Sequence, residues 1–150
     1  MTKESIKVIF VRLEVDGETC LGVLLADDGT VNRLGTGTVD NTDRVLFIGR
    51  SEEPLFARLR EEIQPEWLSH PGEYDAPEKV GRTCTLRIIL KADAGPEFGL
   101  CFRYGSESHG PPADICHFVT ATVRLTDSWH ESQQLLAAGS KKSKPWWKIR

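Results

Sequence analysis

The sequence has no long run of apolar residues. Its longest apolar stretches, Val8 to Val11 and Val45 to Ile48, fall far short of the roughly 20 residues that a membrane-spanning helix needs. The N-terminal stretch also lacks the apolar core of a secretory signal, because Arg12 and Glu14 interrupt the only candidate. We therefore expect a cytosolic protein without a membrane span.

Motifs that would identify a cofactor site are missing as well. The four cysteines form no C-x-x-C pair, which disfavours a zinc site. The segment Gly35-Thr36-Gly37 lacks the third glycine of a phosphate-binding fingerprint, and no G-x-S-x-G nucleophile elbow is present. We predict no metal and no cofactor, and we favour a non-catalytic protein over an enzyme.

The charges are distributed unevenly. The chain holds 19 Lys+Arg and 22 Asp+Glu, but five of the cations fall in residues 141–150, which contain no acid. Residues 1–140 therefore hold 14 cations against 22 acids, a net charge of −8. With 39% hydrophobic residues, residues 1–140 are expected to form one globular domain, followed by a basic tail, residues 141–150.

The first third of the chain is typical of strands joined by tight turns. Residues 7–15 are rich in β-branched and aromatic side chains, and Asp16-Gly17 is a strong hairpin signal. We predict a partner strand at 20–26, and shorter strands at 30–34 and 44–48.

A helix is predicted at about 52–63, with Ser51 as its N-cap. Leu55, Phe56, Leu59 and Ile63 recur at helical spacing on one face. Residues 64–82 contain several prolines and are predicted to form a long irregular connection.

The second half shows period-2 alternation in three stretches, at 84–91, 98–104 and 115–125. We predict three antiparallel strands there, then a helix at about 129–138 with a cap at Asp127 or Ser128 and a stop at Gly139. The expected fold is α+β: a single domain with a twisted, mostly antiparallel sheet, made of a hairpin plus a three-stranded meander, and two helices on one face.

Three polar residues near the last predicted hairpin form a candidate loop site. These are Glu107, His109 and Asp114, and loops carry function disproportionately. In this hairpin Cys101 would lie opposite Cys116, so a redox role for these two thiols stays open.

The basic tail is the strongest functional signal. Tryptophan and arginine dominate interface hot spots. An exposed pair of tryptophans is unfavourable without a partner that covers it. The candidate partner-binding residues are Lys141, Lys142, Lys144, Trp146, Trp147, Lys148 and Arg150.

We therefore hypothesise a protein-binding module: an adaptor, or an inhibitor or immunity-type protein that neutralises a basic partner with its acidic domain. One alternative is a small-molecule-binding protein or enzyme with a cleft near the 64–82 and 105–112 loops. Another is weak binding of an anionic membrane or of nucleic acid through the tail. A homo-oligomer is compatible with each of these.

Overall fold

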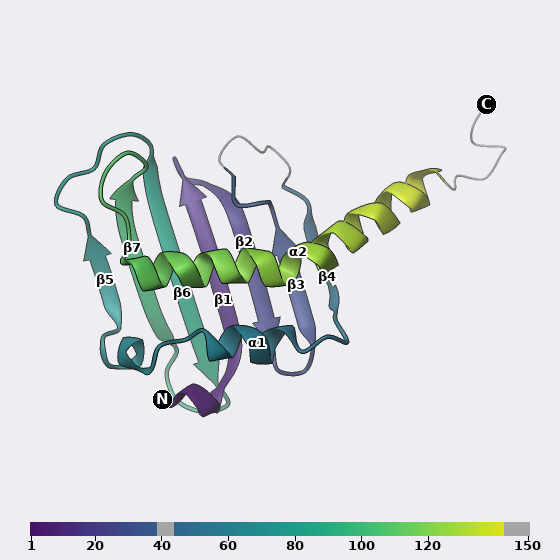
Figure 1. The fold of residues 1–150 in the computed structure, drawn as a ribbon, viewed down its shortest axis with the longest axis horizontal. Helices are drawn as coiled ribbons and strands as arrows, with labels where there is room; N and C mark the ends of the chain where they lie inside the picture. Colours follow the sequence, from purple (N-terminus) through teal and green to yellow (C-terminus); the bar gives the residue numbers. More distant parts are fainter. Residues whose placement is uncertain (39–43, 143–150) are drawn as a thin grey trace.

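A single seven-stranded β-sheet runs through the protein, with both α-helices on one face (Figure 1). The computed structural model describes residues 1–38 and 44–142. The strand order is β4-β3-β2-β1-β6-β7-β5, and every neighbouring pair is antiparallel except β5 and β7. The strands are β1 (Ile6–Val15), β2 (Glu18–Ala26), β3 (Thr30–Leu34), β4 (Leu46–Arg50), β5 (Gly72–Asp75), β6 (Thr83–Ala92) and β7 (Phe98–Gly105). The predicted α+β class is confirmed.

The N-terminal hairpin forms as its sequence predicts. Asp16 and Gly17 adopt φ values of 51° and 82°, which is the pair of positive angles that a type I′ turn requires. β1 and β2 pair in register from Val8 opposite Ala26 to Leu13 opposite Leu21. β3 and β4 continue the sheet outward as an antiparallel meander.

The first helix, α1 (Leu55–Glu61), begins three residues later than predicted. Pro54 explains the shift, because the residue before a proline is driven away from helical angles. Ser51 does not cap the helix; its Oγ instead accepts a hydrogen bond from the backbone N–H of Glu53 at 3.1 Å. The predicted apolar face is nevertheless buried.

The predicted strand at 115–125 is wrong, because these residues belong to a single long helix, α2 (Ala113–Lys142). Its buried side chains recur at helical spacing: Ile115, Phe118, Thr122, Thr126 and Trp129. The two threonines conceal this pattern in the sequence. Their hydroxyls donate to the carbonyls of Phe118 and Thr122, each at 2.8 Å, so they are buried without an unsatisfied hydroxyl.

The predicted cap at Asp127 or Ser128 and stop at Gly139 are also wrong, since α2 continues through all three positions to Lys142. One glycine in a helix costs only about 1 kcal/mol, which a long helix tolerates. The C-terminal third of α2 projects beyond β4 (Figure 1). Leu135 and Leu136 on this projection are 73% and 65% exposed.

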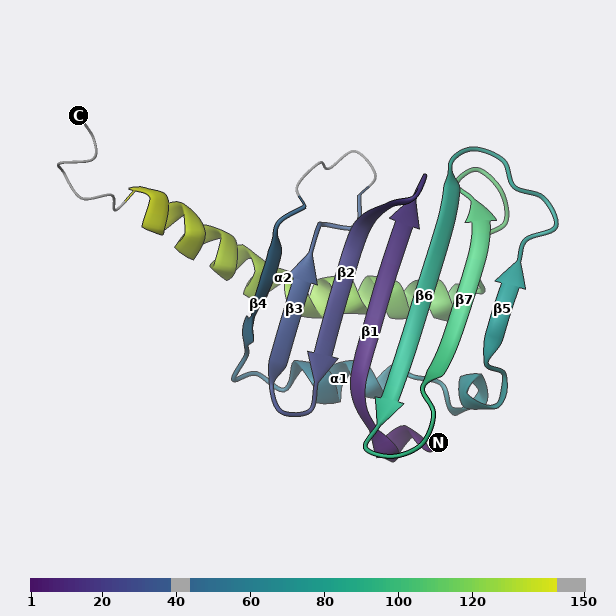
Figure 2. The same ribbon diagram turned by 180° about the vertical axis from the view of Figure 1, so that it is seen from behind.

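The main core lies between the sheet and the two helices. It includes Val11 of β1, Val23 of β2, Ile88 of β6, Leu59 of α1 and Phe118 of α2, each at most 1% exposed. No helix in the described ranges covers the opposite face of the sheet (Figure 2).

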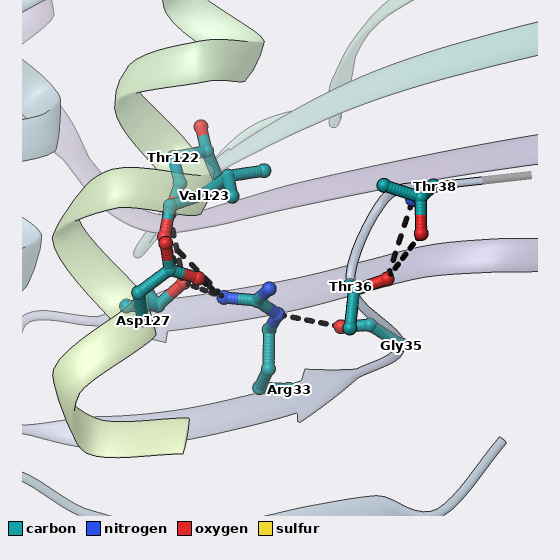
Figure 3. Close-up of polar contacts among 8 residues, drawn as sticks. Arg33, Gly35, Thr36, Thr38, Thr122, Val123 and Asp127 are labelled. Carbon is teal, nitrogen blue, oxygen red and sulfur yellow. Dashed lines mark hydrogen bonds and ion pairs between the residues drawn. The ribbon is translucent and has the colours of Figure 1, made fainter. Parts of the chain in front are cut away.

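A buried arginine fastens α2 to the sheet (Figure 3). Arg33 of β3 is 1% exposed, and its Nε donates to the carbonyl of Gly35 at 2.8 Å. Its Nη1 donates to Thr126 Oγ1 at 2.8 Å and to Asp127 Oδ1 at 3.1 Å. Burial lowers the pKa of the Arg33 guanidinium, and the hydrogen bond and charge of Asp127 oppose this shift. Each contact is internal, so we assign this cluster a structural role.

Candidate functional site

An open cavity of about 520 Å³ lies where β5 and β7 meet the start of α2. β7 contributes Leu100, Phe102 and Tyr104. Trp67 comes from the 3₁₀-helix η2 (Pro65–Ser69), and Tyr74 comes from β5. We call this the aromatic cavity, because four of these five side chains are aromatic.

The cavity arises from the way β5 joins the sheet. β5 has four residues and pairs in parallel only with β7, at the edge. This pairing sets Tyr74 opposite Phe102, and the two rings stack with centroids 5.3 Å apart and planes 17° apart. Tyr74 remains 42% exposed, so one face of the site presents an aromatic ring to solvent.

Trp67 is held by two contacts with α2. Its Nε1 donates to Asp114 Oδ2 at 2.7 Å. Its ring meets that of Phe118 edge-on, with centroids 5.4 Å apart and planes 85° apart. The second carboxylate oxygen of Asp114 accepts a hydrogen bond from the N–H of Ile115 at 2.9 Å. The indole is therefore fixed in position before any ligand arrives.

Carboxylates outnumber cations around the cavity. Glu66, Asp75 and Asp114 line it together with one guanidinium, that of Arg103. Arg103 is already paired with Glu73 at 3.0 Å and with Asp75 at 3.7 Å. The hydrogen bond with Glu73 raises the pKa of Arg103, and the same bond lowers the pKa of Glu73. The lining thus holds three carboxylates and one guanidinium, besides His70, and the carboxylates give it a negative character.

The phenol of Tyr104 is half-buried in this region. Burial, reinforced by the nearby thiols of Cys84 and Cys116, raises the pKa of Tyr104 from 10.0 to about 12. Tyr104 is therefore neutral at physiological pH and contributes an apolar ring rather than a base.

The candidate loop residues fall in different places. Asp114 lies in the first turn of α2 and lines the cavity. Glu107 and His109 lie in the exposed connection between β7 and α2, outside the lining. Within that connection, Gly110, Pro111 and Pro112 reach the cavity.

The predicted pairing of Cys101 with Cys116 is wrong, because Cys116 lies on α2 rather than on a strand. Cys101 instead pairs with Arg87 of β6 and with Glu73 of β5. Cys101 is buried and Cys116 is exposed, and both are free thiols. No redox pair is formed by these two residues.

Two residues of the basic tail, Lys141 and Lys142, form the end of α2. Lys144, Trp146, Trp147, Lys148 and Arg150 lie outside the described residues. Their role as partner-binding residues therefore stays a prediction.

The sequence predicts a cleft near the 64–82 and 105–112 loops as one alternative, but it does not predict that aromatic side chains gather there. Trp67 and Tyr74 are visible as isolated aromatics in the 64–82 segment, and Phe102 and Tyr104 share one parity of a strand. The parallel pairing of β5 with β7 places Tyr74 beside Phe102, and contacts with α2 hold Trp67 in place. The four residues of β5 carry no sequence pattern that predicts this pairing.

Comparisons with known proteins give no match: no protein-family model, no curated protein and no solved structure matches this chain. Among residues 1–38 and 44–142, no helix is long and apolar enough to cross a bilayer. Within the same ranges, no group of three or more His, Cys, Asp or Glu is arranged to hold a metal ion.

Proposed function

We propose that this protein is a non-catalytic protein-binding module, and that the aromatic cavity receives an apolar, preferably aromatic, side chain of its partner. The observation that carries this proposal is the open cavity at the edge of the sheet, lined by Trp67, Phe102, Tyr104 and the exposed ring of Tyr74. Aromatic pairs contribute about 0.5–1.5 kcal/mol beyond the burial of their area. A partner ring inserted beside Tyr74 would gain this contact.

The charges favour a partner with cations next to that ring. Glu66 and Asp114 line the cavity, and residues 1–140 have a net charge of −8 (14 cations against 22 acids). A cation placed over an aromatic face gains about 0.5–2 kcal/mol. Complementary charge also speeds association and disfavours acidic competitors.

The polar groups of the cavity support binding better than catalysis. Both carboxylate oxygens of Asp114 are engaged, one with Trp67 Nε1 and one with the N–H of Ile115. With its pKa near 12, Tyr104 does not act as a base at neutral pH. These groups hold the walls of the cavity in place.

A direct test uses indole and N-acetyl-tryptophanamide as probes, followed by ligand-observed NMR. For indole we expect millimolar binding, since its ring atoms gain roughly 0.3–0.5 kcal/mol each; the larger N-acetyl-tryptophanamide should bind more tightly, at about 0.1 mM or below. Tyr74→Ala removes the solvent-facing wall and should weaken binding about 5- to 10-fold. The matched control is Ile48→Ala, because Ile48 is 68% exposed on β4, away from the cavity. Absence of binding, or equal losses in both variants, would refute the proposal.

A second candidate function is binding of a small molecule in the same cavity. The volume of about 520 Å³ lies within the range of about 300–1,000 Å³ that is typical of ligand sites. Native mass spectrometry of the purified protein distinguishes the two. A retained small molecule that is lost in Tyr74→Ala favours this second function.

A further inference from the structure

We infer that the partner of the aromatic cavity is the basic tail of a second copy of this chain, inserted through residues 143–150. The inference rests on the proposed function of the cavity and deepens it by naming the occupant. It combines three observations: the chemistry of the cavity, the chemistry of the tail and the distance between them.

The chemistry of the tail matches that of the cavity. Trp146 and Trp147 are flanked by Lys144 and Lys148, with no acid among residues 141–150. A tryptophan buries about 150–250 Å² in a contact, and the face of an indole stacks on other rings. The flanking ammonium groups would lie near the carboxylates of the cavity lining, which outnumber its single guanidinium.

Pro145 precedes the tryptophan pair. Proline fixes its own φ near −65° and biases the preceding residue towards extended angles. A residue with restricted angles loses less conformational entropy on binding than an unrestricted one, so Pro145 and Lys144 lower the entropic cost of binding this segment.

The geometry excludes insertion into the cavity of the same molecule. The cavity is lined by Asp114 and Ile115 at the start of α2, whereas residue 143 follows Lys142, the last residue of the same helix. The 30 residues of α2 separate these ends by about 45 Å, at about 1.5 Å per residue. Residues 143–150, fully extended, reach at most about 29 Å. The tail therefore meets the cavity of another copy.

Each copy then offers one cavity and one tail at opposite ends of the same helix. Two copies close into a dimer if a two-fold axis relates them, so that each tail enters the other's cavity. Both arrangements, a closed dimer or a head-to-tail chain, bury the same contact. Variants of the cavity and of the tail should therefore have the same effect on self-association.

The first experiment measures self-association of the full chain by sedimentation velocity over a concentration series. We expect W146A/W147A and Tyr74→Ala each to weaken association at least 10-fold relative to the unmodified chain. The matched control is Ile149→Ala, which removes an apolar side chain from the same segment but leaves the indoles and charges; we expect less than a 3-fold change. A monomeric unmodified chain at all concentrations would overturn the inference.

The second experiment mixes the two defective proteins. W146A/W147A retains the cavity, and Tyr74→Ala retains the tail, so their mixture restores one intact contact in a 1:1 complex. Neither protein alone should form that complex. A mixture that stays dissociated overturns the inference, even if each variant is folded by circular dichroism.

The third experiment separates this inference from the proposed function. A labelled peptide of residues 143–150 is titrated into W146A/W147A and followed by fluorescence anisotropy. We expect binding that weakens at least 10-fold with Tyr74→Ala in the receptor and with K144E/K148E in the peptide. If indole binds the cavity but the peptide does not, the inference fails and the proposed function stands. If the peptide binds anionic vesicles or DNA but not the receptor, the inference also fails.

Discussion

Asp127→Ala should destabilise the protein because it leaves the buried guanidinium of Arg33 without a counter-charge. The Arg33 side chain is 1% exposed, and the side chain of Asp127 is 46% exposed. At their separation of 3.1 Å, Coulomb's law gives about 5 kcal/mol at an effective dielectric of 20 and about 1.3 kcal/mol in water. Because the carboxylate is half in solvent, we expect a loss of about 2 kcal/mol.

The clean form of this test is a double-mutant cycle with Arg33→Met. The methionine fills much of the same space and carries no charge, but it leaves the buried carbonyl of Gly35 without the Nε–H donor. We expect Arg33→Met alone to cost about 1–3 kcal/mol. In that background Asp127→Ala should cost less than about 0.5 kcal/mol, since no cation remains for it to neutralise.

Urea unfolding followed by circular dichroism measures each corner of the cycle. A loss of about 2 kcal/mol corresponds to a decrease in melting temperature of about 4–8 °C for a chain of this size. Equal losses from Asp127→Ala in both backgrounds would refute the reasoning, because the carboxylate would then act through some contact other than Arg33.

Three further outcomes are expected. Thr122→Val removes only a hydroxyl that donates to a helical carbonyl, so it should lower the free energy of unfolding by less than about 1 kcal/mol. Thr126→Val also removes the acceptor of Arg33 Nη1 and should cost about 1–2 kcal/mol more. Urea unfolding compares the two variants. Trp67→Phe loses the 2.7 Å hydrogen bond to Asp114 and should lower the free energy of unfolding by about 1.5–3 kcal/mol. Trp67→Phe/Asp114→Asn should lose the same amount, because the bond is already absent in the single variant. The folded state holds the proton of Tyr104 more tightly than the unfolded state, so stability should fall as the pH rises from about 10 to about 12; phenolate absorbance detects this step, which Tyr104→Phe should abolish.

The N-terminal hairpin was predictable because its signals are local. Alternation over residues 7–15 and the Asp16-Gly17 turn both act within a few residues, and the two positive φ angles follow directly. The apolar face of α1 was predictable for the same reason. Its start differs from the prediction because Pro54 disfavours helical angles at the residue before it, which the apolar spacing does not reveal.

The long helix was not predictable from the same kind of signal. The stretch from Val119 to Val123 is rich in β-branched residues, which favour strands locally. Packing decides otherwise, because Phe118, Thr122 and Thr126 are all buried, and the hydroxyls of the two threonines bond to the helix backbone. Tertiary contacts override propensity here.

The candidate site was only half predictable. Trp67 and Tyr74 are recognisable as aromatics in a proline-rich segment, and a cleft near 64–82 and 105–112 was an expectation of the sequence analysis. The cavity itself depends on β5 pairing with β7 in parallel, a contact between residues about 28 positions apart. Its use as a binding site stays a prediction.

The position of α2 in the chain also affects how the protein is made. All seven strands of the described residues precede Ala113, so the ribosome synthesises them before the helix that covers them. At about 5–20 residues per second, the 30 residues of α2 take roughly 2–6 s to translate. Until α2 is complete, Val11, Val23 and Ile88 lack the cover of that helix, so we expect the unfinished chain to expose apolar surface that the finished protein buries.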